Sequence, residues 1–176
     1  MLMPFIVTKI AHDLAGCAGA VLNTSELLAL DTDSVQEVAP LLNESAQTLV
    51  TRLKFFRCIF GTQTQIPSDI AQKYVRTLSM SFQLKGDFET PLDLGFVLAA
   101  TDWLPKGGMI EKIADGFKIS GSVFNVDPIT EAIFRGEMSE ITPHTAVLFW
   151  LKEQLNTQKQ KVSIRVDANH ISFIIQ

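Results

Sequence analysis

Apolar residues return at steps of four and three along the first thirty residues. Seven of eight such positions are apolar or carry a thiol, and the set is Met3, Val7, Ile10, Leu14, Cys17, Val21 and Leu28, with Thr24 as the polar member. A repeat of about 3.5 residues keeps one line of side chains against a neighbouring helix. The pattern therefore predicts a long helix packed along a partner helix.

The same rhythm returns after the turn-forming stretch "LDTDS" at 30–34. Its apolar positions are Ala39, Leu42, Ala46, Leu49, Leu53, Phe56 and Phe60. Asp33 or Ser34 would cap this second helix. Gly61 would end it in the left-handed conformation, which glycine adopts at least cost. Residues 1–63 are therefore predicted to form an antiparallel helical hairpin.

The second predicted helix carries further apolar residues, Leu41, Phe55 and Ile59, beside its main line. A single hairpin has too little surface to bury both sets. Pairing two hairpins in a four-helix bundle would cover them. We therefore expect a homodimer.

The pattern changes after the stretch "GTQTQIP" at 61–67, which is the predicted linker. Strands are predicted within 79–86, on both sides of an Asp-Gly turn within 109–124, and on both sides of "DAN" near the end of the chain. Helices are predicted to start near Ser68 or Asp69, at 91, at Asp127 and at Thr142. Residues 68–176 thus predict an α+β unit with about five strands on one side and three helices on the other.

Composition narrows the classes of function. The chain has 176 residues and a formal net charge of −4, which offers no basic field for nucleic acid. Its first residues lack the basic start of a signal peptide, and no run approaches the roughly 18 apolar residues of a membrane span. Cys17 and Cys58 lie in apolar helical patterns and are expected to be buried thiols of a cytoplasmic protein. The three histidines are far apart and no CxxC or HxxxH spacing occurs, so we expect no metal site.

His12 is the main candidate for chemistry. At about 100° per residue it lies opposite the apolar line, so its imidazole should face solvent. Its helical neighbours are all small, namely Thr8, Ala15, Gly16 and Gly19. Glycine inside a helix costs about 1 kcal/mol relative to alanine, and access for another protein's backbone is a physical reason to accept that cost. The alternative is an idle surface histidine.

Asp13 follows His12 directly in the sequence. A carboxylate beside a nucleophilic imidazole can hold its tautomer and favour the proton loss that accompanies attack. Asp13 could equally be a solvated surface acid.

Three cations of the second helix, Arg52, Lys54 and Arg57, should lie near the level of His12 in an antiparallel hairpin. They could attract a phosphoryl group or an acidic partner, or serve only the helix dipole and solubility. With Thr8, Lys9, Ala15, Gly16 and Gly19 they form the expected partner-docking surface.

Three stretches carry a family resemblance: "KIAHDLAGCAGAVLNTSELL", "RLKFFRCIFG" and "LGFVLAATDWLPKGG". They resemble the ChpT-like bacterial histidine phosphotransferases, which are relatives of the dimerisation-and-phosphoacceptor plus ATPase-like core of sensor kinases. The resemblance implies a homodimeric four-helix bundle, phosphorylation of His12, and a degenerate histidine-kinase ATPase-like α/β sandwich over residues 68–176. Family members often carry a proline where this chain has Cys17.

The ATP-binding signature of that ATPase-like fold is missing from the sequence. The predicted helix from 91 contains no asparagine to hold magnesium, "ADGF" at 114–117 is not D-x-G-x-G, and neither a glycine-rich lid nor a P-loop is present. We therefore expect no cofactor, with magnesium supplied by a partner. The resemblance implies that the partners are receiver domains of a hybrid histidine kinase and of response regulators, between which His12 relays a phosphoryl group.

Two other interpretations remain open at this point. The chain could be a non-catalytic dimeric scaffold that binds receiver domains, or an ATP-dependent kinase with an unrecognised nucleotide site. Whether it is an enzyme is therefore left open. His144 and His170 are interpreted as structural or surface residues, and Trp103 and Trp150 as core or interface residues.

Overall fold

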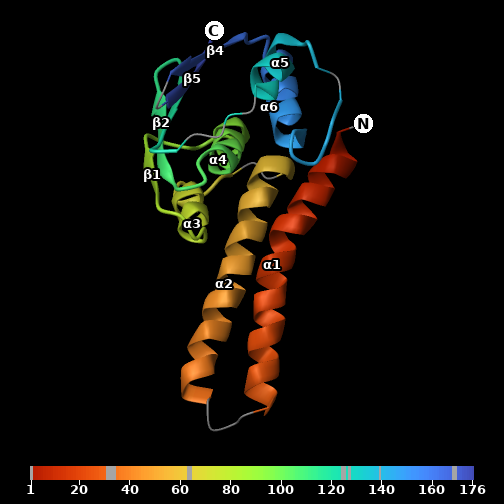
Figure 1. The fold of residues 1–176 in the computed structure, drawn as a ribbon, viewed down its shortest axis with the longest axis vertical. Helices are drawn as coiled ribbons and strands as arrows, with labels where there is room; N and C mark the ends of the chain where they lie inside the picture. Colours follow the sequence, from red (N-terminus) through yellow and green to blue (C-terminus); the bar gives the residue numbers. More distant parts are fainter. Residues whose placement is uncertain are drawn as a thin grey trace.

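Two long helices run antiparallel below an α/β body (Figure 1). The structure is a computed structural model that describes residues 2–30, 35–62, 65–123, 126, 128–138, 140–167 and 170–176. Helix α1 spans Met3–Leu30 and helix α2 spans Val35–Phe60, so the predicted hairpin is present. The predicted caps Asp33, Ser34 and Asp127 lie outside the described residues.

Gly61 follows the last residue of α2, but its geometry differs from the prediction. Its N–H donates to the carbonyl oxygen of Arg57 at 3.0 Å, and its φ is not in the left-handed region. A Cβ at this position would lie 2.4 Å from that same oxygen. Close approach to the helix backbone, not a positive φ, is what requires glycine here.

The body is built on a five-stranded sheet with the order β1-β2-β3-β5-β4. Its strands are β1 (Phe82–Lys85), β2 (Gly108–Ile113), β3 (Gly116–Ser120), β4 (Val162–Asp167) and β5 (His170–Ile175). The pairing of β1 with β2 is parallel and the other pairings are antiparallel. The predicted strands are therefore present, including the hairpin at the Asp-Gly turn.

The described residues of the body form four helices, one near each of the four predicted starts. They are α3 (Ile70–Arg76), α4 (Pro91–Trp103), α5 (Ile129–Arg135) and α6 (Ala146–Thr157). Helix α4 is capped by Thr90, whose hydroxyl accepts from the N–H of Asp93 while the Asp93 carboxylate accepts from the N–H of Thr90. This reciprocal pair fixes where α4 begins.

Helix α6 begins later than the sequence predicted. The N–H of Thr142 donates to the hydroxyl of Thr145 at 2.9 Å, and this turn occupies the expected first helical residues. His144 therefore lies in the turn before α6 and not in its first turn. At α3, Asp69 makes no capping bond through its side chain and instead pairs with Lys73 at 2.6 Å.

The core lies between the sheet and helices α4 and α6. Phe96 of α4 stacks on Phe117 at 4.2 Å between ring centroids, and Trp103 stacks on Phe173 at 5.3 Å. Both tryptophans are buried, as predicted. A Cβ on Gly95 would lie 2.5 Å from the ring of Trp150, so glycine lets α4 and α6 approach closely.

The upper end of the hairpin is built into the body. Phe55 stacks on Tyr74 of α3 with ring centroids 3.8 Å apart, and Ile59 is buried beside it. These two residues were expected to be covered by a second copy, and the expectation is wrong for them because the chain's own body covers them. Leu41 remains exposed.

The apolar line of α1 holds only below its first two turns. Met3 and Val7 are exposed, whereas Leu2 and Ile6 are buried. Helix α6 lies beside the start of α1 (Figure 1) and takes up a different face of the helix there. Below this region, Cys17 is buried and α1 faces α2 as the seam predicts.

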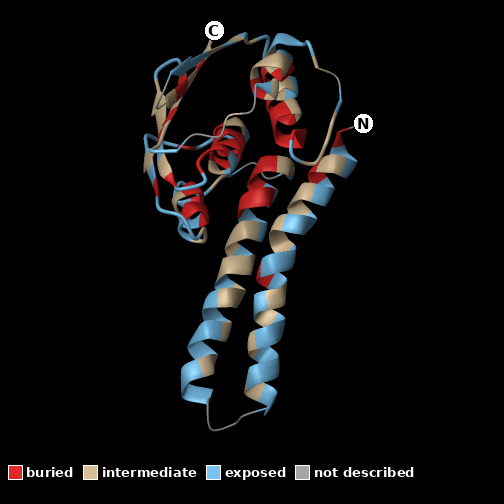
Figure 2. Ribbon diagram, in the orientation of Figure 1, coloured by how far each residue is buried: buried red, intermediate tan, exposed pale blue. Residues whose placement is uncertain are grey.

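The lower half of the hairpin is largely exposed (Figure 2), and several of its exposed side chains are apolar. Large exposed apolar side chains there are Leu22, Leu27, Leu30, Val35 and Leu41. Val50 and Leu53 are exposed higher on α2, so the predicted seam is wrong for Leu53. By length and composition alone α1 could cross a membrane, although no run of consecutive apolar residues predicted this. One such helix near the N-terminus is weak grounds for a membrane span, and Lys9, His12 and Asp13 lie within it.

Candidate functional site

His12 lies on α1, on the surface of the upper hairpin near the α/β body. Its side chain is 89% exposed, which is the outward orientation that the seam predicted. The imidazole is therefore accessible to another macromolecule without any movement of this chain.

The side chains next to His12 on the surface of α1 are small and leave open space around it. Ala15 and Gly16 are exposed, and a Cβ added at Gly16 or Gly19 would meet nothing within 4 Å. The hydroxyl of Thr8 folds back onto the carbonyl oxygen of Pro4 at 2.9 Å. The neighbours predicted from the sequence thus leave open space around the imidazole, and neither helical glycine is demanded by packing within this chain.

Asp13 is turned partly inward and its side chain is 23% exposed. Its two carboxylate oxygens have different partners. Oδ1 lies 3.5 Å from Nδ1 of His12, and Oδ2 lies 3.2 Å from Nζ of Lys9. The carboxylate therefore stands between the imidazole and an ammonium group.

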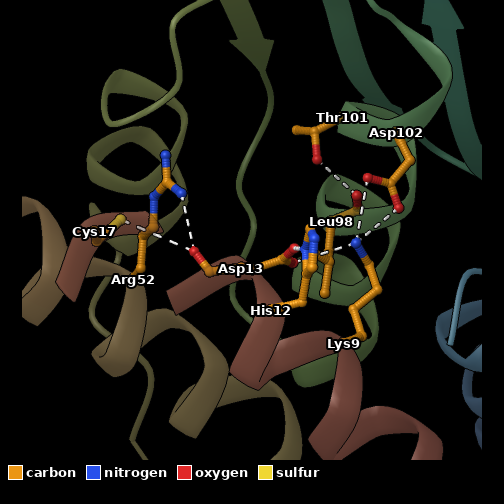
Figure 3. Close-up of polar contacts among 8 residues, drawn as sticks. All are labelled: Lys9, His12, Asp13, Cys17, Arg52, Leu98, Thr101 and Asp102. Carbon is orange, nitrogen blue, oxygen red and sulfur yellow. Dashed lines mark hydrogen bonds and ion pairs between the residues drawn. The ribbon is translucent and has the colours of Figure 1, made fainter. Parts of the chain in front are cut away.

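Lys9 continues this line of charges to the α/β body (Figure 3). Its Nζ lies 3.2 Å from Oδ2 of Asp102, at the end of α4. The side chain of Lys9 is only 11% exposed. Burial alone would lower the pKa of Lys9, but the carboxylates of Asp102 and Asp13 outweigh it and raise this pKa. Lys9 was expected on the docking surface; its charge is instead used inside the chain.

Asp102 was missed by sequence reasoning. The side chain of Asp102 is 48% exposed, and its partial desolvation against the hairpin raises the pKa of its carboxyl against the opposing effect of Lys9. It lies 93 residues from Lys9 in the chain, and no local pattern connects the two positions. The contact follows from the packing of the body on the hairpin.

Arg52 lies at the level of the site, as the hairpin geometry predicted, but its guanidinium is engaged within the chain. Nη2 donates to the carbonyl oxygen of Thr77 at 2.7 Å, and Nε donates to the Thr77 hydroxyl at 3.1 Å. Nη1 donates to the carbonyl oxygen of Asp13 at 3.4 Å. Arg52 therefore joins α1, α2 and the end of α3.

The other two predicted cations lie elsewhere. Lys54 lines a separate groove between α2 and the start of α3, together with Asp69 and Lys73. Arg57 is exposed in the last turn of α2. The structure thus brings Lys9, Asp13 and Arg52 together near His12 and does not gather all three cations of α2 there.

A cavity of about 300 Å³ opens beside this cluster. It lies between the hairpin and the body, and its lining includes Asp13, Arg52, Tyr74, Met80 and Asp102. The space next to Asp13 is therefore bounded by both parts of the chain, and His12 is not among its lining residues.

Cys17 occupies the position where the family resemblance expects proline. Its side chain is buried, and its Sγ lies 3.9 Å from the carbonyl oxygen of Asp13. The thiol therefore contacts the helix turn that carries His12 and Asp13. Cys58 is also buried, as predicted, and burial raises the pKa of its thiol.

Of the other two histidines, His170 stands apart from this site, whereas His144 acts electrostatically on Asp102. His144 is exposed in the turn before α6, and Nε2 of His170 lies 2.9 Å from Asp167 at the turn between β4 and β5. Within the described residues, no group of three or more histidine, cysteine, aspartate or glutamate side chains could hold a metal ion.

Comparison with known proteins identifies the fold. A solved structure of a bacterial phosphotransferase superposes with a TM-score of 0.80, covering 99% of this chain and 95% of that chain at 22% sequence identity. No protein-family model matches the chain, and no curated protein matches it. The chain therefore shares the fold of a bacterial phosphotransferase over nearly its whole length.

Proposed function

We propose that the chain is a ChpT-like histidine phosphotransferase that relays a phosphoryl group between receiver-domain aspartates through phospho-His12. One observation carries the proposal: on a fold shared with a bacterial phosphotransferase, His12 is 89% exposed and has a carboxylate on its Nδ1 side. A structural histidine needs neither the open surround nor this orientation.

The chemistry needs a neutral imidazole with a free Nε2. Nε2 attacks the phosphorus of a receiver's aspartyl phosphate in line, an N–P bond forms, and the acyl-phosphate P–O bond breaks. The receiver's carboxylate leaves with the electron pair. Asp13 lies where it stabilises the positive charge that develops on the ring and can accept the Nδ1 proton. The reverse reaction with a second receiver passes the phosphoryl group on.

This chain contributes mainly positioning. An exposed nucleophile on a rigid helix can be placed within reach of a bound receiver, which brings its own magnesium. No ATP is needed by this route. In support, the helix that would hold magnesium in the kinase fold, α4, is buried along its length from Asp93 to Ala100 and is packed by aromatic rings.

The proposal includes a cytoplasmic homodimer. The exposed apolar residues of the lower hairpin form a surface that a single copy leaves in water, and a monomer rarely tolerates such a surface. A second hairpin packed there would complete a four-helix bundle. An apolar dimer interface on α1 would also account for the high hydropathy of this helix, so that no membrane is needed to explain it.

Transfer of label tests this function. The purified chain is incubated with a receiver domain carrying radioactive aspartyl phosphate, and then with a second, unlabelled receiver. We expect label on the chain and then on the second receiver. A receiver that binds with no label ever reaching the chain would establish the scaffold interpretation instead. A nucleotide titration tests the ATP-dependent kinase, which predicts saturable ATP binding.

A further inference from the structure

The α/β body places one of its own side chains against the charges beside His12. Asp102, at the end of α4, pairs with Lys9, which pairs with Asp13, which faces His12. We propose that Lys9 and Asp102 are positioning residues that orient Asp13 toward His12. The reactivity of His12 then depends on how the α/β body packs against α1. This inference rests on the proposed function and adds two residues to its site.

The two oxygens of the Asp13 carboxylate contact different groups. Lys9 holds Oδ2 at 3.2 Å, which leaves Oδ1 directed to Nδ1 of His12 at 3.5 Å. That distance is slightly longer than a strong hydrogen bond, and catalytic contacts of this kind commonly shorten when the partner binds. Without Lys9, the carboxylate would be free to rotate to orientations in which neither oxygen faces Nδ1 of His12.

Asp102 explains why Lys9 stays in place. A largely buried ammonium group needs compensating charge, and here it has two carboxylates from two different helices. Asp102 is fixed by α4, whose C-terminal turn is closed by the Thr101 hydroxyl donating to the carbonyl oxygen of Leu98 at 2.7 Å (Figure 3). Movement of the body away from α1 would separate Asp102 from Lys9.

Charged and titratable groups face this line from every packed element. Helix α1 contributes Lys9 and Asp13, and α4 contributes Asp102. Helix α2 contributes Arg52, which donates to the carbonyl oxygen of Asp13. Helix α3 contributes Tyr74, which interacts electrostatically with Asp13 and Asp102, and His144 before α6 acts on Asp102 electrostatically. Lys9 carries the positive charge that stands next to the Asp13 carboxylate.

A chemical consequence follows for the transfer step. With Oδ1 of Asp13 accepting the Nδ1 proton, the neutral imidazole keeps its lone pair on Nε2, which is the exposed and attacking atom. After attack, the positive charge on the ring faces the same carboxylate. The positive charge of Lys9 partly offsets the negative charge of the Asp13 carboxylate. The carboxylate therefore stabilises a protonated His12 ring less strongly before attack.

The tautomer of His12 tests this inference without any partner. Two-bond hydrogen–nitrogen spectra of the full chain labelled with ¹⁵N-histidine are compared for the wild type, Lys9→Met and Lys9→Arg, with His12→Gln identifying the signal. We expect the Nδ1-protonated form in the wild type and in Lys9→Arg, and a shift away from it in Lys9→Met. Equal tautomers in the wild type and Lys9→Met, both folded by circular dichroism, would overturn the proposal.

The pH dependence of label transfer is the second test. Lys9→Met removes the positive charge beside Asp13 that partly offsets the attraction of this carboxylate for a positively charged ring. We expect the acid limb of the pH–rate profile to move upward and the rate near pH 7 to fall roughly tenfold, with both restored by Lys9→Arg. A uniform loss of rate at every pH would show a structural role only, and would contradict the proposal.

Asp102→Asn separates positioning from charge. It weakens the contact between α1 and α4 but leaves the Lys9 charge beside Asp13, so we expect slower transfer with no upward movement of the acid limb. An upward movement equal to that of Lys9→Met would count against the proposal. If the wild type takes no label at all, the proposed function fails, while the tautomer spectra still decide the role of Lys9.

Discussion

The guanidinium of Arg52 donates to the carbonyl oxygen of Thr77 at 2.7 Å, and this bond links helix α2 to the end of α3. The same guanidinium reaches the carbonyl oxygen of Asp13, one residue after His12. A cation predicted to receive a partner therefore serves to hold the hairpin and the body together around the site.

Replacing Arg52 by alanine is expected to destabilise the fold by about 2 kcal/mol. The change removes charge-assisted bonds and leaves the carbonyl oxygen of Thr77 without its donor. Urea denaturation measures the free energy of unfolding. Lys54→Ala, at an exposed position two residues along the same helix, is the matched control and should change that free energy by less than about 0.5 kcal/mol. Equal effects of the two variants would contradict the role given to Arg52.

Acidic substitutions on the lower hairpin are expected to dissociate the proposed dimer. Leu27→Glu and Leu41→Glu each place a charge on an exposed apolar surface, which should disfavour a buried interface and leave the monomer fold intact. Sedimentation equilibrium measures the mass in solution. Ser25→Glu, at an exposed polar position of α1, adds the same charge and tests for a general charge effect. A wild type that sediments as a monomer would refute the dimer itself.

Gly16 should show a conflict between stability and function. Alanine there meets no neighbour within 4 Å and improves helix propensity, so Gly16→Ala is expected to raise the stability of the fold by up to about 1 kcal/mol. Gly16→Phe should keep the fold but obstruct a receiver that approaches His12, and so lower the rate of label transfer. Thermal unfolding and transfer assays are run on both variants. Transfer by Gly16→Phe at the wild-type rate would show that the open surround of His12 is not used.

Alkaline pH should weaken the fold partly through Lys9. Its pKa is raised above the usual 10.5, so the folded state holds this proton more tightly than the unfolded chain. The stabilisation is complete below pH 10.5 and is lost as pH rises through the raised value. Burial also raises the pKa of Tyr74, which lowers stability in the same alkaline range. The free energy of unfolding should therefore fall less steeply above pH 10.5 in Lys9→Met than in the wild type; equal slopes would contradict this assignment.

The elements of this fold could largely be predicted from the sequence because their signals are local. The seam of α1 and α2 predicted the hairpin and the outward direction of His12, and the Asp-Gly turn predicted the β2–β3 hairpin. Small residues around His12 predicted its open surround. Each of these inferences depends on residues within a few helical turns or a single turn of the chain.

Contacts between distant segments could not be predicted in the same way. An apolar residue on a helix predicts that the residue is buried but does not identify the segment that covers it. Phe55 and Ile59 were therefore assigned to a second copy, although the body covers them. The pairing of Lys9 with Asp102 depends on how α4 seats against α1, which no spacing in the sequence encodes. The site therefore emerged in two parts, a nucleophile visible in the sequence and a supporting charge network visible only in the fold.

The most direct test of the account is the identity of the labelled residue. Radioactive receiver is incubated with the wild type, with His12→Gln and with His170→Gln, which alters a histidine at the start of β5, outside the site. We predict label on the wild type and on His170→Gln, stable in alkali and lost in acid as expected for phosphohistidine, and no label on His12→Gln. Label on a folded His12→Gln variant would contradict the account.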